Sequence, residues 1–148
     1  MLDAVKHYLL DTDIYSLFLR KERNVVESVS RHAVNEVALT IITVQEIWGG
    51  WSAALAKARS VEEIAYGYRR LTETIHELKT WRVETFPAAA IERFHSLKKQ
   101  RLNVGANDLK IAAIALEAGA VVVTRNLRDF QGVPGLSCED WTKAESIG

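Results

Sequence analysis

Short apolar runs alternate along this chain with longer segments in which apolar residues recur every three or four positions. Four runs are candidate strands, at 8–10, 37–42, 81–83 and 121–123. Strands without polar positions on either face are typical of parallel sheets that are buried on both sides. The sequence therefore predicts an α/β fold in which a mostly parallel central sheet is flanked by helices.

The segments between these runs have helical spacing. The longest, 61–78, is predicted to be an amphipathic helix. Its apolar face comprises Ile64, Ala65, Tyr68, Leu71 and Ile75. Two further helices are expected, one that begins after Pro87 and one over 109–118 that ends at Gly119. Trp48 and Trp51 flank Gly49-Gly50, which predicts core packing with close helix approach, or alternatively a surface for a partner protein.

Composition narrows the class of protein. The 148 residues contain no repeat or linker, so we expect a single domain over 1–148. The single cysteine, Cys138, excludes an internal disulfide framework and suits a reducing compartment. The longest nearly apolar stretch, 111–123, contains Glu117 and is shorter than the ~20 residues that span a bilayer. We therefore expect a cytoplasmic protein without a membrane segment.

Net charge limits the mode of nucleic-acid binding. The chain has 19 Lys and Arg against 19 Asp and Glu, so its formal net charge is zero. Proteins that bind nucleic acid indiscriminately carry a basic excess, because phosphate contacts provide their affinity. Any contact with nucleic acid must therefore come from a local arrangement of charges.

Four acidic residues lie near the predicted strand ends. Asp11 follows the first strand, Glu46 follows the second by one turn, and Asp108 opens the helix before the strand at 121–123. Asp129 comes a few residues after that strand. In parallel α/β sheets the carboxyl ends of the strands form a crevice, so these side chains can meet there.

Each acidic residue also has a structural interpretation. Asp11 or Asp13 can cap the helix that follows, and Asp129 can be a solvated surface residue. Glu46 completes a capping box with Thr43, in which it would bond the Thr43 backbone amide. Asp108 can complement a helix dipole beside a capping Asn107. Taken singly, the structural interpretations are favoured.

Taken together, the acids predict a metal site. Unit charges about 4 Å apart repel by roughly 4 kcal/mol at an effective dielectric constant of ~20, so gathered carboxylates need a cation or a proton. The four His residues show no metal-ligand spacing. A set of carboxylate ligands favours Mg²⁺ or Mn²⁺, which can activate water and neutralise charge on a phosphodiester.

Four ordered motifs carry a resemblance to a known family. They are LLDTDI at 9–14, TVQEIWGG at 43–50, GANDLKIAA at 105–113 and VTRNLRDF at 123–130. Together with VPGL at 133–136 and EDW at 139–141, they resemble PIN-domain ribonucleases, and more narrowly VapC-type toxins of bacterial toxin–antitoxin pairs. The resemblance covers nearly the whole chain. It implies a PIN-like three-layer fold and a Mg²⁺-dependent endoribonuclease in which Mn²⁺ can substitute.

The resemblance also implies partners and roles for residues. An RNA substrate, a small cognate antitoxin and a second copy of the chain are the expected partners. Asp11, Glu46 and Asp108 fall on the family's acidic, metal-holding positions, and Thr12 and Thr124 on its supporting hydroxyl positions. Two positions are candidates for the family's fourth acid. Asn126 stands where many relatives carry Asp, while Asp129 offers a carboxylate one turn later. Asp13 also departs from the family, in which Asn is common.

Basic residues near the acids are candidates for binding RNA phosphates. Lys98, Lys99 and Arg101 precede the loop that leads to Asp108. Arg125 lies close to the fourth acid, where it can contact substrate or pair with an acid in the absence of metal.

Two rival functions remain. The first is a haloacid-dehalogenase-type phosphatase with Asp11 as nucleophile and Asp13 as acid/base. That pattern requires Thr or Val at the position of Tyr15, and it leaves Glu46 and Asp108 without a role. The second is a PIN-like partner-binding module with weak or no catalysis, for which Asn126 is the supporting feature.

Overall fold

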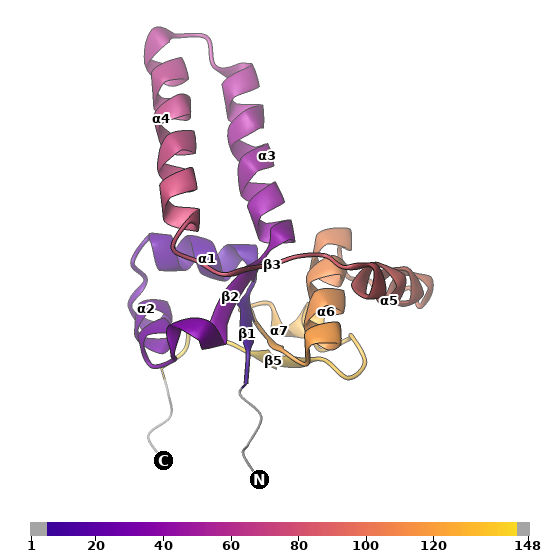
Figure 1. The fold of residues 1–148 in the computed structure, drawn as a ribbon. Coiled ribbons are helices and arrows are strands. Elements are labelled where there is room, and N and C mark those ends of the chain that lie inside the picture. The colour runs from indigo at the N-terminus through magenta and orange to yellow at the C-terminus, as the bar shows by residue number, and fades with distance from the viewer. Residues whose placement is uncertain (1–5, 145–148) are drawn as a thin grey trace.

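The computed structural model describes residues 6–144, which form a five-stranded parallel sheet with helices on both faces (Figure 1). The strands are β1 (Tyr8–Leu10), β2 (Val37–Thr40), β3 (Val83–Glu84), β4 (Val121–Val123) and β5 (Ser137–Glu139). Their order across the sheet is β3-β2-β1-β4-β5, and every neighbouring pair is parallel. The predicted fold class is confirmed.

Alternating side chains of the central strands build two cores. Leu9 and Val122 point to one face, where they pack with α5 (Ala88–Lys99), α6 (Ala106–Ala118) and α7 (Leu127–Phe130). Leu10 and Val123 point to the other face, against α1 (Thr12–Leu19) and α2 (Arg23–Ser30). Both strands are buried on each face, as the absence of polar positions in them predicts.

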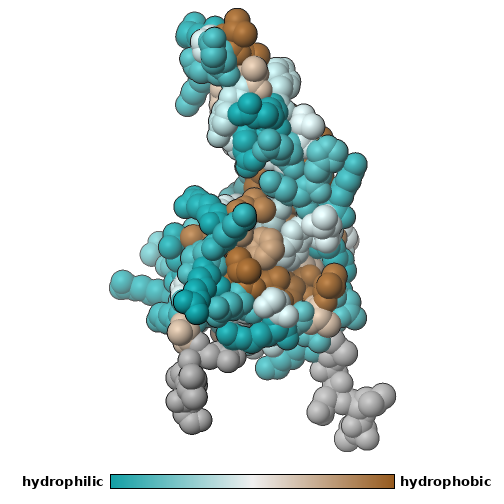
Figure 2. All heavy atoms as spheres, turned by 90° about the vertical axis from the view of Figure 1, so that its left-hand side faces the viewer, coloured by the Kyte–Doolittle hydropathy of each residue, from teal (hydrophilic) through white to brown (hydrophobic). Residues whose placement is uncertain are grey.

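The helices α3 (Ile41–Lys57) and α4 (Val61–Leu78) form a hairpin that projects away from the sheet (Figure 1). The bounds of α4 match the prediction, but its apolar face does not enter a core, since Tyr68 remains 59% exposed. In Figure 2, apolar surface is concentrated low on the α1–α2 side, whereas the visible side of the hairpin is mainly hydrophilic. The hairpin therefore stands outside the two cores, and most of its residues are exposed.

The expectation that Trp48 packs in the core and that the adjacent glycines allow close helix approach is wrong. Trp48 is 44% exposed, and a Cβ on Gly49 or Gly50 would meet no atom within 4 Å. The close approach is instead at Gly67 of α4, where a Cβ would lie 2.6 Å from Leu55 Cδ2. Close approach within the hairpin is therefore made by a glycine of α4 against a leucine of α3.

The second strand is shorter than predicted. It ends at Thr40, whose hydroxyl accepts a hydrogen bond from Thr43 N across 3.4 Å and caps α3. The capping box that begins at Thr43 is therefore wrong, because the helix starts three residues earlier. Two other boundaries also shift. The strand predicted at 81–83 is found at Val83–Glu84. Helix α6 begins after Gly105, so Asn107 is inside the helix and does not cap it.

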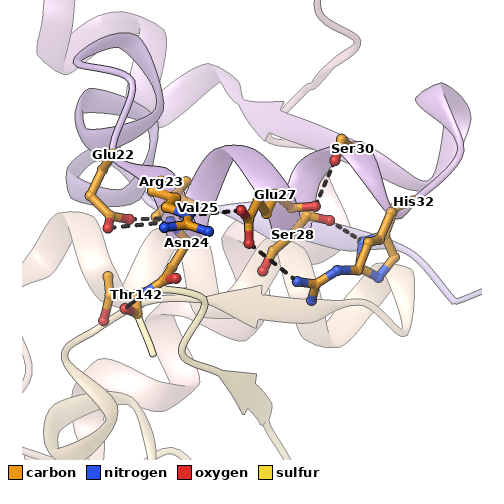
Figure 3. A network of polar contacts seen from close by, with 10 residues as sticks. Glu22, Arg23, Asn24, Val25, Glu27, Ser28, Ser30, His32 and Thr142 are labelled. Carbon is orange, nitrogen blue, oxygen red and sulfur yellow. Dashed lines mark hydrogen bonds and ion pairs between the residues drawn. The ribbon is translucent and has the colours of Figure 1, made fainter. Parts of the chain in front are cut away.

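Helix α2 is joined to the C-terminal segment by polar contacts (Figure 3). The Glu22 carboxylate caps the helix by accepting from the backbone N–H groups of Asn24 and Val25. Asn24 then donates from its side-chain amide to the carbonyl of Thr142 across 2.7 Å. These bonds hold the end of the described chain against the α1–α2 layer. Within residues 6–144, none of the helices has the length and apolarity needed to cross a membrane.

Candidate active site

The acidic residues predicted from sequence come together at the carboxyl end of the sheet. Asp11 directly follows β1, Glu46 lies in the second turn of α3, and Asp108 lies in the first turn of α6. Repulsion from Asp108 acts on the pKa of Asp11, and repulsion from Glu46 and Asp129 acts on the pKa of Asp108. All four carboxylates therefore belong to one electrostatically coupled group.

Asp11 is the most buried member of the group, with 6% of its surface exposed. Its Oδ1 accepts from Ile14 N across 2.8 Å, so the capping role is real. Burial, followed by the charges of Asp13 and Asp108, raises the pKa of Asp11 to about 6 despite the lowering effect of hydrogen bonds from Ile14 and Thr124. A buried carboxylate under this repulsion favours a bound cation or a proton.

Glu46 is held by a chain of hydroxyl groups. Thr12 Oγ1 donates to Glu46 Oε1 across 2.8 Å and lies 3.0 Å from Thr43 Oγ1. Because the Thr12 hydroxyl has one hydrogen, which goes to Glu46, the Thr43 hydroxyl must donate to Thr12. Thr43 is fully buried, so this chain orients Glu46 from inside the fold.

The loop after β4 contacts two of the acids, Asp11 and Asp129. Thr124 is fully buried, and its hydroxyl bonds the Asp11 carboxylate and accepts from Asn126 N across 2.9 Å. The Asn126 side-chain amide donates to Asp129 Oδ2 across 2.9 Å. Burial raises the pKa of Asp108, with added repulsion from Glu46 and Asp129. The Asn126 side chain thus orients the carboxylate of Asp129.

Of the predicted basic residues, the structure brings Arg125 to the acids. Its guanidinium makes two hydrogen bonds to Asp13, Nε to Oδ2 across 2.5 Å and Nη2 to Oδ1 across 3.1 Å. The ammonium group of Lys98 lies 5.8 Å from the centroid of the Phe94 ring, and its contact with RNA stays a prediction. Lys99 and Arg101 are exposed at the end of α5 and just beyond it, and their contact with RNA stays a prediction.

The donor set of the site fits a hard divalent cation. Its acids are carboxylates, two of them with raised pKa values because their charges are buried and face one another. Oxygen donors of this kind suit Mg²⁺ or Mn²⁺. Among residues 6–144, however, no three His, Cys, Asp or Glu side chains converge closely enough to hold a metal ion. The carboxylates are therefore close enough to repel one another, but they do not surround one point as a complete set of metal ligands would.

A groove of about 700 Å³ runs between α1, α3 and α4, and Glu46 is the member of the acidic group that lines it. Thr12 and Glu46 line it near the acids, and Trp51 and Arg70 line it along the hairpin. Tyr15 lies at its side, with a buried hydroxyl that has no hydrogen-bond partner in the described chain. A bound chain in this groove would pass directly beside Glu46.

Sequence reasoning misses the roles of two residues at this site. The sequence predicts a capping box that begins at Thr43, and this wrong helix start hides the donation from Thr43 to Thr12. The sequence offers Asp13 as a possible helix cap, whereas the structure pairs its carboxylate with Arg125. The signal for this pair lies in the sequence, because Arg125 is predicted to pair with an acid in the absence of metal.

Comparisons of the sequence and of the fold relate this chain to known proteins. The family model described as PIN domain matches residues 8–136. The chain is 33% identical over 144 residues to Ribonuclease VapC1 of Haemophilus influenzae strain R2866, covering 92% of this chain and 98% of that protein. Its fold is similar to DNA-bound VapBC from Salmonella typhimurium, with a TM-score of 0.72, 23% identity and coverage of 92% and 98%. A toxin–antitoxin complex from Klebsiella pneumoniae matches with a TM-score of 0.65, 23% identity and coverage of 87% and 94%.

Proposed function

The chain belongs to the PIN domain family, among its VapC-type members, and from this premise we propose that it is a Mg²⁺-dependent endoribonuclease. The observation that carries the proposal is that Asp11, Glu46 and Asp129, which come from three separate segments, each lie close enough to Asp108 for their charges to repel. Structural roles alone do not require four acids from separate segments to share one place. The name of the Haemophilus influenzae relative supports RNA as the substrate class.

In this proposal Asp11, Glu46 and Asp108 hold one divalent cation, Mg²⁺ or Mn²⁺. Such a cation, when bound, lowers the pKa of water and neutralises charge on a phosphodiester. Thr124 keeps Asp11 in place, and Thr12 keeps Glu46 in place. Asp129, oriented by Asn126, accepts a hydrogen bond from the attacking water. Burial of Asp11 keeps bulk water from competing for its carboxylate.

The test is the substitution Asp108→Asn, which keeps the shape of the side chain and removes its charge. We expect cleavage of RNA in Mg²⁺ to fall below detection while the melting temperature is kept or rises, because a repelled charge is lost. Glu92→Gln is the matched control, since Glu92 is an exposed acid on α5. If Asp108→Asn protein cleaves RNA as fast as the wild type, the assignment is wrong.

We propose that the antitoxin partner binds in the groove between α1, α3 and α4. The groove runs from Glu46 along the hairpin, so an occupant would block access to Glu46. Ala54 lines the groove and is exposed, so Ala54→Trp would fill it. We expect this variant to lose co-purification with the small protein encoded beside it while still cleaving RNA. Unchanged co-purification would place the antitoxin elsewhere.

We also propose a homodimer that forms through α3. Trp48 and Ile41 are 44% and 40% exposed, and their spacing of seven residues places them on one face of the helix. Large apolar side chains exposed in this way are typical of interfaces. Light scattering should give the mass of a dimer for the wild type and of a monomer for Trp48→Glu. A monomeric wild type, or a dimeric variant, would contradict this proposal.

A partner-binding module without catalysis is the second candidate function. It is favoured by the absence of a closed ligand shell among the described residues and by Asn126 at a position where the resemblance expects an acid. Calorimetric titration with Mn²⁺ distinguishes the two. The nuclease predicts binding that is lost in Asp11→Asn and Asp108→Asn, and the module predicts no such binding. In either case we propose one domain over 1–148 that acts in the cytoplasm.

A further inference from the structure

The ion pair between Asp13 and Arg125 joins two segments that are far apart in sequence. Asp13 lies in the first turn of α1, and Arg125 lies in the loop after β4. Two N–H groups on one edge of the guanidinium bond the two carboxylate oxygens, across 2.5 and 3.1 Å. This paired arrangement fixes the plane and the direction of the guanidinium, which a single contact would not do.

The pair lies at the edge of the acidic group. Asp13 follows Asp11 by two residues, and its charge contributes to the raised pKa of Asp11. The neighbours of Arg125 are both engaged with acids, because Thr124 bonds Asp11 and Asn126 bonds Asp129. Three successive residues of one loop therefore contact three different carboxylates. The backbone of Arg125 is fixed on both sides.

Stability alone does not account for this pair. The side chains of Arg125 and Asp13 are 55% and 46% exposed, and exposed ion pairs contribute less than about 1 kcal/mol to folding. A guanidinium has five N–H groups, and two of them are used by Asp13. Three N–H groups remain for an anionic ligand. Because its carboxylate is paired with Arg125, Asp13 is not among the acids that hold the cation in the proposed function.

We propose that Asp13 is a positioning residue, which holds the Arg125 guanidinium at the edge of the acidic group as a contact for a phosphate of the RNA. The inference rests on the proposed ribonuclease function and adds a substrate contact to the same site. Arg125 touches the RNA in this arrangement, and Asp13 acts only through Arg125. The acids hold the cation, while Arg125 binds the backbone of the strand beside it.

The test measures binding of a fluorescein-labelled single-stranded RNA oligonucleotide in Mg²⁺, with Asp108→Asn in every variant to prevent cleavage. Arg125→Ala should raise the Kd about tenfold, which is typical for loss of one charged hydrogen-bonding group. It should also lower the slope of log Kd against log salt concentration by about one, as expected for one phosphate contact. Arg93→Ala is the matched control, because Arg93 forms an exposed ion pair with Glu117 between α5 and α6. Its Kd should equal that of the parent.

The Kd of Asp13→Asn should change in opposite directions if Asp13 positions Arg125 and if Asp13 acts only through its charge. Removing a negative charge near bound RNA should tighten binding if charge alone matters. If Asp13 positions Arg125, Asp13→Asn should raise the Kd, and it should not weaken binding further in the Arg125→Ala background. Tighter or unchanged binding in Asp13→Asn, or an unchanged Kd in Arg125→Ala, would overturn the inference. A wild type that binds this RNA but does not cleave it would instead contradict the ribonuclease proposal.

Discussion

Thr12 donates a hydrogen bond to Glu46 across 2.8 Å, and this bond is the last step of a chain that starts at buried Thr43. Glu46 itself is exposed, so its carboxylate depends on Thr12 for orientation. A side chain on α1 therefore positions an acid on α3. The two helices approach the same edge of the sheet from neighbouring strands.

Substitution of Thr12 by Val should loosen Glu46 without changing the charge of the site. We expect a roughly 10–100-fold fall in Mn²⁺ affinity or in RNA cleavage, the usual range for residues that orient metal ligands. Thr12→Ser keeps the hydroxyl and should stay close to the wild type. Calorimetry and cleavage rates provide the two measurements. Equal behaviour of Val and Ser at this position would mean that Glu46 does not need the hydrogen bond.

The raised pKa of Asp11 predicts an unusual dependence of stability on pH. The folded state has a pKa of about 6 at Asp11, against an ordinary value of 3.8. Between about pH 4 and pH 6 the folded chain keeps a proton that the unfolded chain has released, so the free energy of unfolding falls as pH rises. The loss is complete above pH 6 and amounts to about 2–3 kcal/mol in the absence of metal.

The measurement is the difference in melting temperature between Asp11→Asn and the wild type, taken without divalent cations. Asn still caps α1 but has no charge, so the difference should be small near pH 4 and should grow in favour of the variant up to about pH 7. Saturating Mg²⁺ at pH 7 should reduce it again. A difference independent of pH would show that Asp11 is not destabilised by burial.

Asn126 and Asp129 form a hydrogen-bonded pair, and the pair is favourable because Asn126 carries no charge. Asn126→Asp would replace the 2.9 Å hydrogen bond by repulsion between two carboxylates. Without divalent cations we expect a loss of about 1 kcal/mol, or roughly 2–4 °C in melting temperature. Saturating Mg²⁺ should stabilise this variant more than it stabilises the wild type, because the added charge lies at the acidic group. Asn126→Ala, which loses the bond without gaining charge, separates the two effects.

The convergence of the acids could be predicted from sequence, because parallel strands place their carboxyl ends at one edge. The bounds of α4 could also be predicted, since Ser60 caps it and its apolar spacing is regular. The end of β2 could not. Ile41 and Ile42 are β-branched and favour a strand, but the Thr40 hydroxyl captures the Thr43 amide and starts a helix. That local competition hid the Thr43–Thr12–Glu46 chain.

The contact between Gly67 and Leu55 was also beyond prediction, because it depends on how the two hairpin helices face each other. A Cβ at position 67 would lie 2.6 Å from Leu55 Cδ2 and 3.1 Å from its Cγ, so Leu55 would have to turn away or the helices separate. Gly67→Ala should therefore lower the free energy of unfolding by about 1 kcal/mol in urea titrations. Gly50→Ala on α3, where nothing lies within 4 Å of the new Cβ, should raise it by about 0.5–1 kcal/mol through helix propensity.

A double variant separates the clash from other effects of the new methyl group. Leu55→Ala removes the atoms that a Cβ at position 67 would meet, at the cost of the packing between α3 and α4. In that background Gly67→Ala should no longer destabilise, and it should recover part of the loss because alanine favours the helix. If Gly67→Ala is as harmful in the Leu55→Ala background as in the wild type, the methyl group clashes elsewhere and the hairpin is not joined at this point.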